Sequence, residues 1–135
     1  MPDVKGVLKL YSKLFAPSEN IRAVEDILND KNYRFYVMSE KGETISTMTA
    51  VICRNAVGKG QPYMLIDNIA TDPKHQGKGL ASKLYKEVEA WAKERGCSKI
   101  IIVSNKRFKI EKFYHSLGLE SKTSKVYIKR LWKMK

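Results

Sequence analysis

Residues 76–81 are the strongest candidates for chemistry in this sequence, because they join a predicted strand, residues 63–70, to a predicted amphipathic helix that starts at about Gly79. The first turn of a helix has backbone N–H groups without intrahelical partners, and the aligned peptide dipoles add partial positive charge there. Gly77 and Gly79 have no Cβ, so the backbone can turn sharply and approach a bulky anion closely. The junction is therefore predicted to bind a phosphate or diphosphate group.

Two other phosphate-binding loops are excluded by their spacing. A Walker loop requires glycine, four residues and then Gly-Lys-Ser/Thr, and the sequence contains no such run. A dinucleotide-binding fingerprint requires a third glycine where Ser82 stands, and it follows its strand directly, whereas residues 71–75 intervene here. The remaining interpretations are a phosphate-binding turn of another kind and a glycine-rich turn without a ligand.

The composition fits one domain with a strongly basic surface. At 135 residues the chain can bury a core without disulfides, so we expect a single domain over residues 1–135. It has 26 Lys and Arg against 14 Asp and Glu, a formal net charge of +12, and such a surface attracts anions. Because acidic residues are interleaved and no nucleic-acid-binding motif is found, we favour phosphorylated small molecules over nucleic acid as partners.

Cys53 and Cys97 are predicted to be buried free thiols. The sequence has no disulfide framework and no Cys/His cluster, which favours a reducing compartment and a site without metal. Residues 1–15 lack the apolar core of a signal peptide, and no run approaches the roughly 20 apolar residues of a membrane-spanning helix. We therefore expect a soluble, cytoplasmic protein that does not associate with membranes.

Periodic patterns place the candidate turn inside an α/β domain. The predicted helices cover residues 4–15, 21–28, 79–96 and 110–118, and the predicted strands cover residues 33–39, 44–53, 63–70, 99–103 and 126–132. The nearly continuous apolar run of residues 99–103 is typical of a strand buried on both faces. This order predicts one mixed sheet with helices on its faces.

The candidate turn also resembles a known signature. Residues 76–81 are similar to the Gln/Arg-x-x-Gly-x-Gly/Ala pattern of the GCN5-related N-acetyltransferase family, with Gln76 first, Gly79 fourth and Ala81 sixth. In that family the signature lies between a strand and a helix, as predicted here.

Two further elements carry the same resemblance. Residues 66–73 look like the strand that precedes the signature, and residues 112–119 look like the late Phe-Tyr-x-x-x-Gly-Phe element. The three elements occur in the family's order and spacing, so the resemblance covers roughly residues 33–131. Within the family, the signature region and residues 96–101 are most similar to glucosamine-phosphate N-acetyltransferases.

The resemblance implies a single mixed, mostly antiparallel sheet flanked by helices, the acyl-CoA N-acyltransferase fold. Family members usually carry a further strand before the first helix, whereas only residues 1–3 precede it here. The first family strand is therefore expected to be missing or supplied otherwise, and a homodimer that covers the sheet edge is one remedy.

The resemblance further implies acetyl-CoA as the donor and a primary amine, of a small molecule or a protein, as the acceptor. Transfer is direct, and a backbone N–H at a strand bulge, mapping to about Ile69, polarises the thioester carbonyl. The cofactor-binding residues that it implies are Ile69, Ala70, Thr71, Gln76, Gly77, Lys78, Gly79, Leu80, Ala81, Ser82 and Asn105.

Tyr114 matches the family's general-acid position, and its phenol would protonate the departing thiolate. Without the signature, Tyr114 would be interpreted as one aromatic of a helix stripe. Asp67 is the nearest candidate for the base, although it could equally point away and pair with a lysine, and proton loss to water is an equal alternative. The usual asparagine spacing falls on Arg107 rather than Asn105, and Arg107 could contact a phosphate. His75 and His115 are expected at the surface.

Two other functions remain as alternatives. The first is a non-catalytic domain that binds coenzyme A as a sensor or assembly module. It predicts the same cofactor-binding residues, but Tyr114 would then have no role in catalysis. A basic nucleic-acid binder is less favoured, and its affinity would fall steeply with salt.

Overall fold

The computed structural model describes residues 3–103, 108–121 and 126–131. It divides into two compact units, Met1–Val103 and Ser104–Lys135, which are described one at a time. A single domain over the whole chain therefore stays a prediction.

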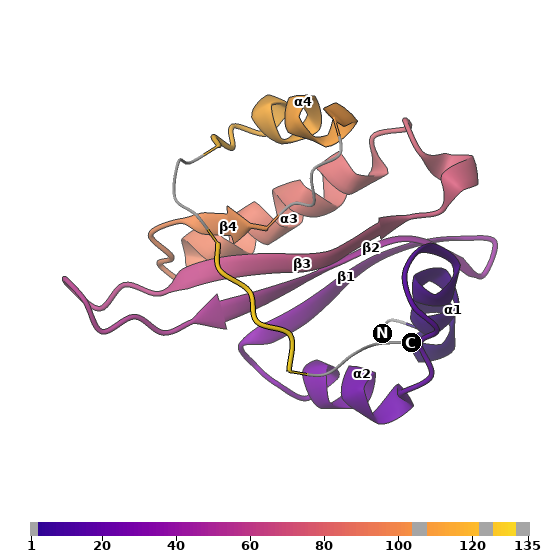
Figure 1. The fold of residues 1–135 in the computed structure, drawn as a ribbon, viewed down its shortest axis with the longest axis horizontal. Coiled ribbons are helices and arrows are strands. Elements are labelled where there is room, and N and C mark those ends of the chain that lie inside the picture. The colour runs from indigo at the N-terminus through magenta and orange to yellow at the C-terminus, as the bar shows by residue number, and fades with distance from the viewer. Residues whose placement is uncertain (1–2, 104–107, 122–125, 132–135) are drawn as a thin grey trace. The chain divides into compact units, whose positions relative to one another are not determined.

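The first unit is built on a four-stranded sheet with the order β1-β2-β3-β4 (Figure 1). Strand β2 pairs antiparallel with β1 and with β3, and β4 pairs parallel with β3. The prediction of a mixed, mostly antiparallel sheet is therefore confirmed. No strand precedes the first helix within residues 3–103, so β1 forms one edge of the sheet. The strands are β1 Tyr33–Glu40, β2 Glu43–Cys53, β3 Tyr63–Thr71 and β4 Ile100–Ile102.

Helices cover both faces of this sheet (Figure 1). Helices α1, Val4–Leu14, and α2, Ile21–Leu28, lie on one face, and α3, Leu80–Glu94, lies on the other. The apolar stripe of α1 packs on β3, where Ala70 belongs to the same buried cluster as the helix residues. The buried residues that join α1 to β3 are Val7, Leu10, Tyr11 and Ala70.

Gly6 explains how closely α1 approaches the sheet. A Cβ at this position would lie 2.6 Å from Thr44 Oγ1, which is closer than real Cβ contacts allow. A glycine inside a helix costs roughly 1 kcal/mol relative to alanine. Here that cost is offset by the close packing of α1 on β2.

Helix α3 begins and ends at glycines with positive φ. Gly79 is its N-cap with φ 76°, and Gly96 follows its last turn with φ 73°. The N–H of Cys97 donates to Ala92 O at 2.9 Å, which closes the helix in the way predicted for Gly96. Trp91 is buried, and the Arg34 guanidinium stacks on its ring at 4.2 Å, which fastens α3 to β1.

The second unit contains α4, Phe108–Ser116, and Gly118, two residues after the helix ends, has φ 87°. The predicted last strand is wrong for residues 126–131, which form no strand. A strand requires a ladder partner and a buried face, whereas Val126 and Tyr127 are 63% and 88% exposed. Trp132 lies outside the described residues.

Two other predictions about burial also need correction. Strand β4 is shorter than residues 99–103 and only half-buried, because it lies at the edge of the described sheet. Cys53 and Cys97 are free but partly exposed rather than buried. Among the residues described, no helix has both the length and the apolar character needed to cross a membrane.

Candidate active site

The loop between β3 and α3 presents unpaired backbone amides. Within residues 3–103, the N–H groups of Gly77, Lys78 and Gly79 donate to no protein acceptor. Gly79 is the N-cap of α3 and has no side chain to cap the first turn. The amides of a helix's first turn have no intrahelical acceptor, so they extend the same donor surface into Leu80 and Ala81.

The two glycines are required by backbone geometry and leave space in front of the loop. Gly77 and Gly79 have φ values of 80° and 76°, which residues with a Cβ rarely adopt. A Cβ built on either residue meets no atom of the described residues within 4 Å. The side of the loop on which these Cβ atoms would lie is therefore open to a ligand.

Asp72 anchors the turn that leads into this loop. Its buried carboxylate accepts a hydrogen bond from Lys74 N at 2.9 Å and one from Lys13 Nζ at 3.0 Å. The Lys74 hydrogen bond, and then the Lys13 ammonium, hold the pKa of Asp72 below its usual value. Asp72 N donates to Ile45 O at 2.7 Å, so this one residue links the turn to α1 and to β2.

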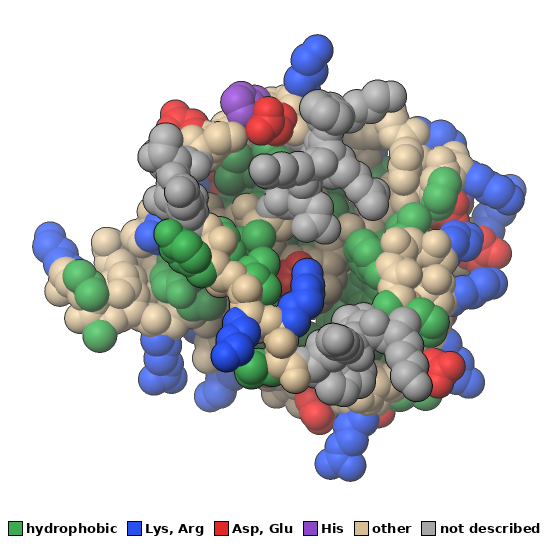
Figure 2. Space-filling model, viewed as in Figure 1, with side chains coloured by type: hydrophobic (Ala, Val, Ile, Leu, Met, Phe, Trp, Pro, Cys, Tyr) green, Lys and Arg blue, Asp and Glu red, His purple; other side chains and the backbone are tan. Residues whose placement is uncertain are grey.

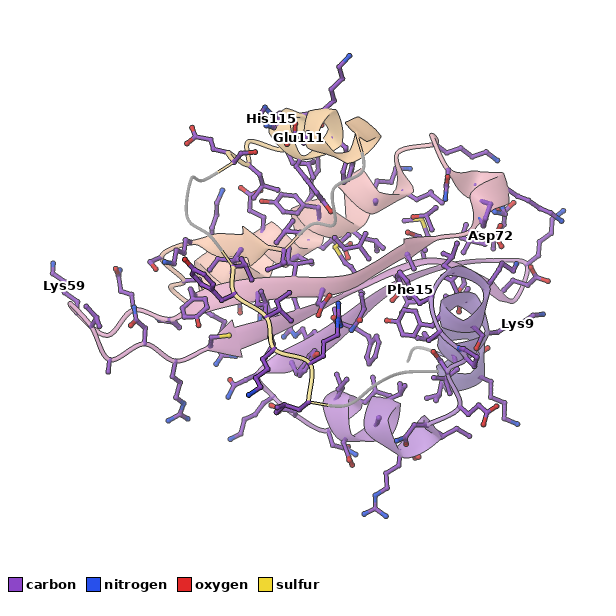
Figure 3. The ribbon with its side chains drawn as sticks, viewed as in Figure 1. Lys9, Phe15, Lys59, Asp72, Glu111 and His115 are labelled. Atoms are coloured by element: carbon purple, nitrogen blue, oxygen red, sulfur yellow. The ribbon has the colours of Figure 1, made fainter. Side chains whose placement is uncertain are left out.

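The flanking residues add further anchors. His75 Nε2 lies 2.9 Å from Glu40 Oε2, and the side chain is only 20% exposed, so the expectation of a surface histidine is wrong for His75. His75 belongs to the short 3₁₀ helix η1, Pro73–His75, and Glu40 is the last residue of β1. Gln76 Nε2 donates to Thr71 O at 3.2 Å. His115, by contrast, is exposed as expected (Figure 3).

Sequence reasoning missed Asp72 and Lys13. The Asp72-Pro73 pair does carry a local signal, because aspartate before proline is a common helix start. Lys13 is separated from Asp72 by 59 positions, and no local pattern indicates such a contact. Figure 3 shows Asp72 beside α1, at the end of the sheet where Lys9 projects from the same helix.

Strand β3 contains a bulge directly before this turn. Thr47 pairs with Ala70, and Thr49 pairs with Asp67, so three steps on β3 oppose two on β2. Asn68 has φ 52°, an unusual conformation for a residue other than glycine. The resemblance placed a bulge at about Ile69, and the structure has one at residues 67–70.

A set of hydrogen bonds surrounds the bulge. Asn68 N donates to Asp67 Oδ1 at 2.8 Å, and Asn68 Nδ2 donates to Thr49 Oγ1 at 3.2 Å. Thr49 Oγ1 in turn donates to Asp67 O at 3.0 Å, and Thr49 is only 1% exposed. Asp67 itself is exposed, and no ion pair joins it to a lysine within residues 3–103.

The remaining predicted site residues differ in burial and in the unit to which they belong. Ala70 is buried in the α1 cluster, so only its backbone is available to a ligand. Tyr114 lies on α4 in the second unit, where its ring centroid is 5.5 Å from that of Phe113. Asn105 and Arg107 lie outside the described residues. Partly buried side chains belong to Ile69, Thr71, Leu80, Ala81 and Ser82, and exposed ones to Gln76 and Lys78.

A cavity of about 380 Å³ lies beside η1, on the α1 side of the sheet. Its lining carries both signs of charge, and the Lys13–Asp72 ion pair neutralises part of it. It therefore defines no anion site comparable to the loop amides. The charged and polar residues that line it are Asp3, Lys5, Lys9, Lys13, Glu43, Thr44, Asp72, Lys74 and His75.

Basic side chains do not gather at one place on the visible face of the molecule. Figure 2 shows Lys and Arg side chains scattered over this face, with Asp and Glu among them. On this face, therefore, no local cluster of positive charge marks an anion site.

Solved structures share this fold. An acetyltransferase from Trypanosoma brucei superposes with a TM-score of 0.84 at 19% identity, covering 95% of this chain and 93% of that chain. Glucosamine-6-phosphate N-acetyltransferase from Arabidopsis thaliana gives 0.82 at 18% identity, with 95% and 94% covered. An aminoglycoside 6′-N-acetyltransferase from Acinetobacter haemolyticus gives 0.79 at 22% identity, with 96% and 93% covered. These similarities define the acyltransferase fold.

The sequence profile of the acetyltransferase (GNAT) family matches residues 4–119. The matched region runs from α1 through the bulged strand and the glycine loop to the residues that follow α4. The chain therefore belongs to this family. No curated protein has significant sequence similarity to it.

Proposed function

We propose that this protein is an acetyl-CoA-dependent N-acetyltransferase that moves acetyl to a primary amine by direct attack. The observation that carries the proposal is the row of unpaired amides at Gly77, Lys78 and Gly79, which directly follows a bulged strand. Membership of the acetyltransferase family supports the same reaction.

The loop fits the diphosphate of coenzyme A in shape and in charge. Its amides are free to donate, and the Cβ positions of Gly77 and Gly79 are open. Anions are stabilised at such a helix start by oriented N–H groups and by the helix dipole. We propose that the backbone from Gln76 to Ser82 binds the diphosphate, and that residues 69–71 and Asn105 bind the pantetheine arm.

The chemistry assigns one task to each part of the site. The Ile69 N–H donates to the thioester oxygen, where negative charge develops, and a preorganised donor of this kind is worth roughly 3 kcal/mol of barrier. The Tyr114 hydroxyl donates its proton to the departing sulfur, since a phenol is protonated at neutral pH. The proton of the attacking amine passes to Asp67 or to water.

The acceptor is proposed only as a primary amine. Similar structures include an aminoglycoside N-acetyltransferase and a glucosamine-6-phosphate N-acetyltransferase, and both of these acceptors carry primary amines. The net charge of +12 disfavours polyamines, because like charges repel in an acceptor cleft. We also propose that the protein is cytoplasmic and that it forms a homodimer in which the partner covers the β1 edge of the sheet.

Release of free thiol from acetyl-CoA, measured against a panel of amines, tests the reaction. We expect at least one amine to raise thiol release well above hydrolysis. Coenzyme A binding without transfer to any amine would favour the sensor or assembly domain instead. Absence of coenzyme A binding, with salt-sensitive binding of nucleic acid, would contradict both interpretations.

A further inference from the structure

Asp67, Asn68 and Thr49 form a closed hydrogen-bonded set around the β3 bulge. We propose that Asp67 is a positioning residue, which fixes the direction of the Ile69 amide through Asn68 and Thr49, and not the base that takes the amine proton. This inference rests on the proposed function, because it assigns a role within that same site.

The direction of the Ile69 N–H depends on the residue before it. The peptide unit between Asn68 and Ile69 is planar and rigid, so its orientation follows from the backbone angles of Asn68. Asn68 holds φ 52°, a left-handed conformation that is uncommon for residues other than glycine and that asparagine tolerates better than most. A change in the Asn68 conformation would therefore turn the Ile69 N–H away from its target.

The side chains of all three residues enforce this conformation. Asp67 Oδ1 accepts from the N–H of Asn68 at 2.8 Å, which fixes one end of the bulge. Thr49 Oγ1 both accepts from Asn68 Nδ2 and donates to Asp67 O, which ties the same end of the bulge to β2. Thr49 is 1% exposed, so water cannot replace its hydroxyl if the group is removed.

The same contact argues against Asp67 as the base. A general base must have a lone pair aimed at the proton it removes, within hydrogen-bond distance. Asp67 Oδ1 is directed at its neighbour's amide, so only Oδ2 is left to take up a proton, and the side chain is exposed to solvent, where water is available as another acceptor. Holding the bulge requires an acceptor oxygen and not a negative charge.

Asparagine and alanine at position 67 separate the two roles. Asp67→Asn keeps an Oδ1 that accepts from Asn68 N but cannot take up a proton, whereas Asp67→Ala removes both abilities. If Asp67 is a positioning residue, Asp67→Asn should retain kcat within about threefold, with an unchanged pH profile. Asp67→Ala should lose kcat by roughly 10- to 100-fold, while the KM for acetyl-CoA stays nearly unchanged. Equal loss in both variants, together with loss of the acidic limb of the pH profile, would overturn the proposal.

Thr49 supplies a second test with matched variants. Thr49→Val should lower kcat as Asp67→Ala does, and Thr49→Ser, which keeps the hydroxyl, should restore it. Thr47→Val is the control, because Thr47 lies two residues away on β2, is fully buried, and its Oγ1 makes none of the described hydrogen bonds to Asp67 or Asn68. Loss of kcat in Thr47→Val equal to that in Thr49→Val would contradict a specific role of the bulge. Thermal unfolding identifies any variant that fails to fold.

Amide NMR makes the inference independent of turnover. The ¹H–¹⁵N signals of Asn68 and Ile69 should move strongly in Asp67→Ala and little in Asp67→Asn. Unchanged signals in Asp67→Ala would overturn positioning even in an active enzyme. Wild-type protein that transfers no acetyl group would overturn the proposed function, and the NMR comparison would still decide whether Asp67 holds the bulge.

Discussion

Lys13 Nζ lies 3.0 Å from Asp72 Oδ2, and this ion pair joins α1 to the turn that precedes the glycine loop. The partners differ in exposure, since 46% of the Lys13 side chain is exposed but only 8% of that of Asp72. The Lys13 ammonium therefore contributes one contact, which solvent screens. The buried Asp72 carboxylate also accepts from Lys74 N, and water cannot take the place of this carboxylate. Asp72→Ala should weaken coenzyme A binding by roughly tenfold through displacement of the loop, and Lys13→Met by about twofold or less. Calorimetry of both variants checks the order, and equal losses of affinity would show that the ion pair alone holds the turn.

The pKa of Asp72 predicts a dependence of stability on pH. Its value is lowered in the folded state, so the unfolded chain binds more protons between the folded-state pKa and the ordinary value of 3.8. The stability that Asp72 contributes is therefore fully present above about pH 4 and is lost as the pH falls through the folded-state pKa. Asp72→Asn should be less stable than wild type at pH 7, and the difference should narrow below pH 4. Urea unfolding at several pH values measures this, and a constant difference would contradict it.

Gly79→Ala should weaken coenzyme A binding by more than its effect on folding explains. A Cβ at φ 76° costs roughly 1–2 kcal/mol, and here it would also lie in the open space before the loop. Gly58→Ala is the matched control, because Gly58 has φ 65° and an equally open Cβ position in another loop. Both variants should lose similar stability in denaturant, and only Gly79→Ala should lose affinity. Equal affinities for coenzyme A would count against the loop as the binding site.

Tyr114→Phe should lower kcat by about 10²- to 10⁴-fold, the usual contribution of a general acid, with nearly unchanged affinity for coenzyme A. Tyr127→Phe serves as the control, since Tyr127 is 88% exposed and should tolerate the loss of its hydroxyl. A Tyr114→Phe variant with wild-type turnover would assign protonation of the thiolate to another donor.

Gly6→Ala should destabilise the protein although alanine is the better helix former. Its Cβ would lie 2.6 Å from Thr44 Oγ1, and overpacking of this kind typically costs about 1–3 kcal/mol, against a gain in helix propensity of roughly 1 kcal/mol. In a Thr44→Ala background only the Asp3 side chain, whose Oδ2 would lie 2.8 Å from the new Cβ, still has to move, so the same substitution should be less destabilising than in the wild-type protein. Thermal unfolding of the four proteins gives the coupling, and additive effects would show that α1 moves away without cost.

Local patterns predicted the elements around the site well. The strand, glycine loop and helix from β3 to α3 were expected within a residue or two, because the apolar periodicity, Gly79 and Gly96 are local signals. The position of the bulge came from the family resemblance, since nothing in the strand's own pattern indicates that Asn68 adopts positive φ. The Lys13–Asp72 and Thr49–Asn68 contacts could not be predicted, because each joins residues far apart in sequence. The prediction of a strand is wrong for residues 126–131, because an apolar composition alone does not supply the neighbouring strand that a ladder requires.

An NMR titration with coenzyme A tests the central claim most directly, with pantetheine, which lacks the diphosphate, as the comparison. The account predicts that coenzyme A shifts the amide signals of Gly77, Lys78 and Gly79 more than other signals, and that pantetheine leaves these three nearly unchanged. Coenzyme A shifts confined to another part of the chain, or equal shifts with pantetheine, would contradict it.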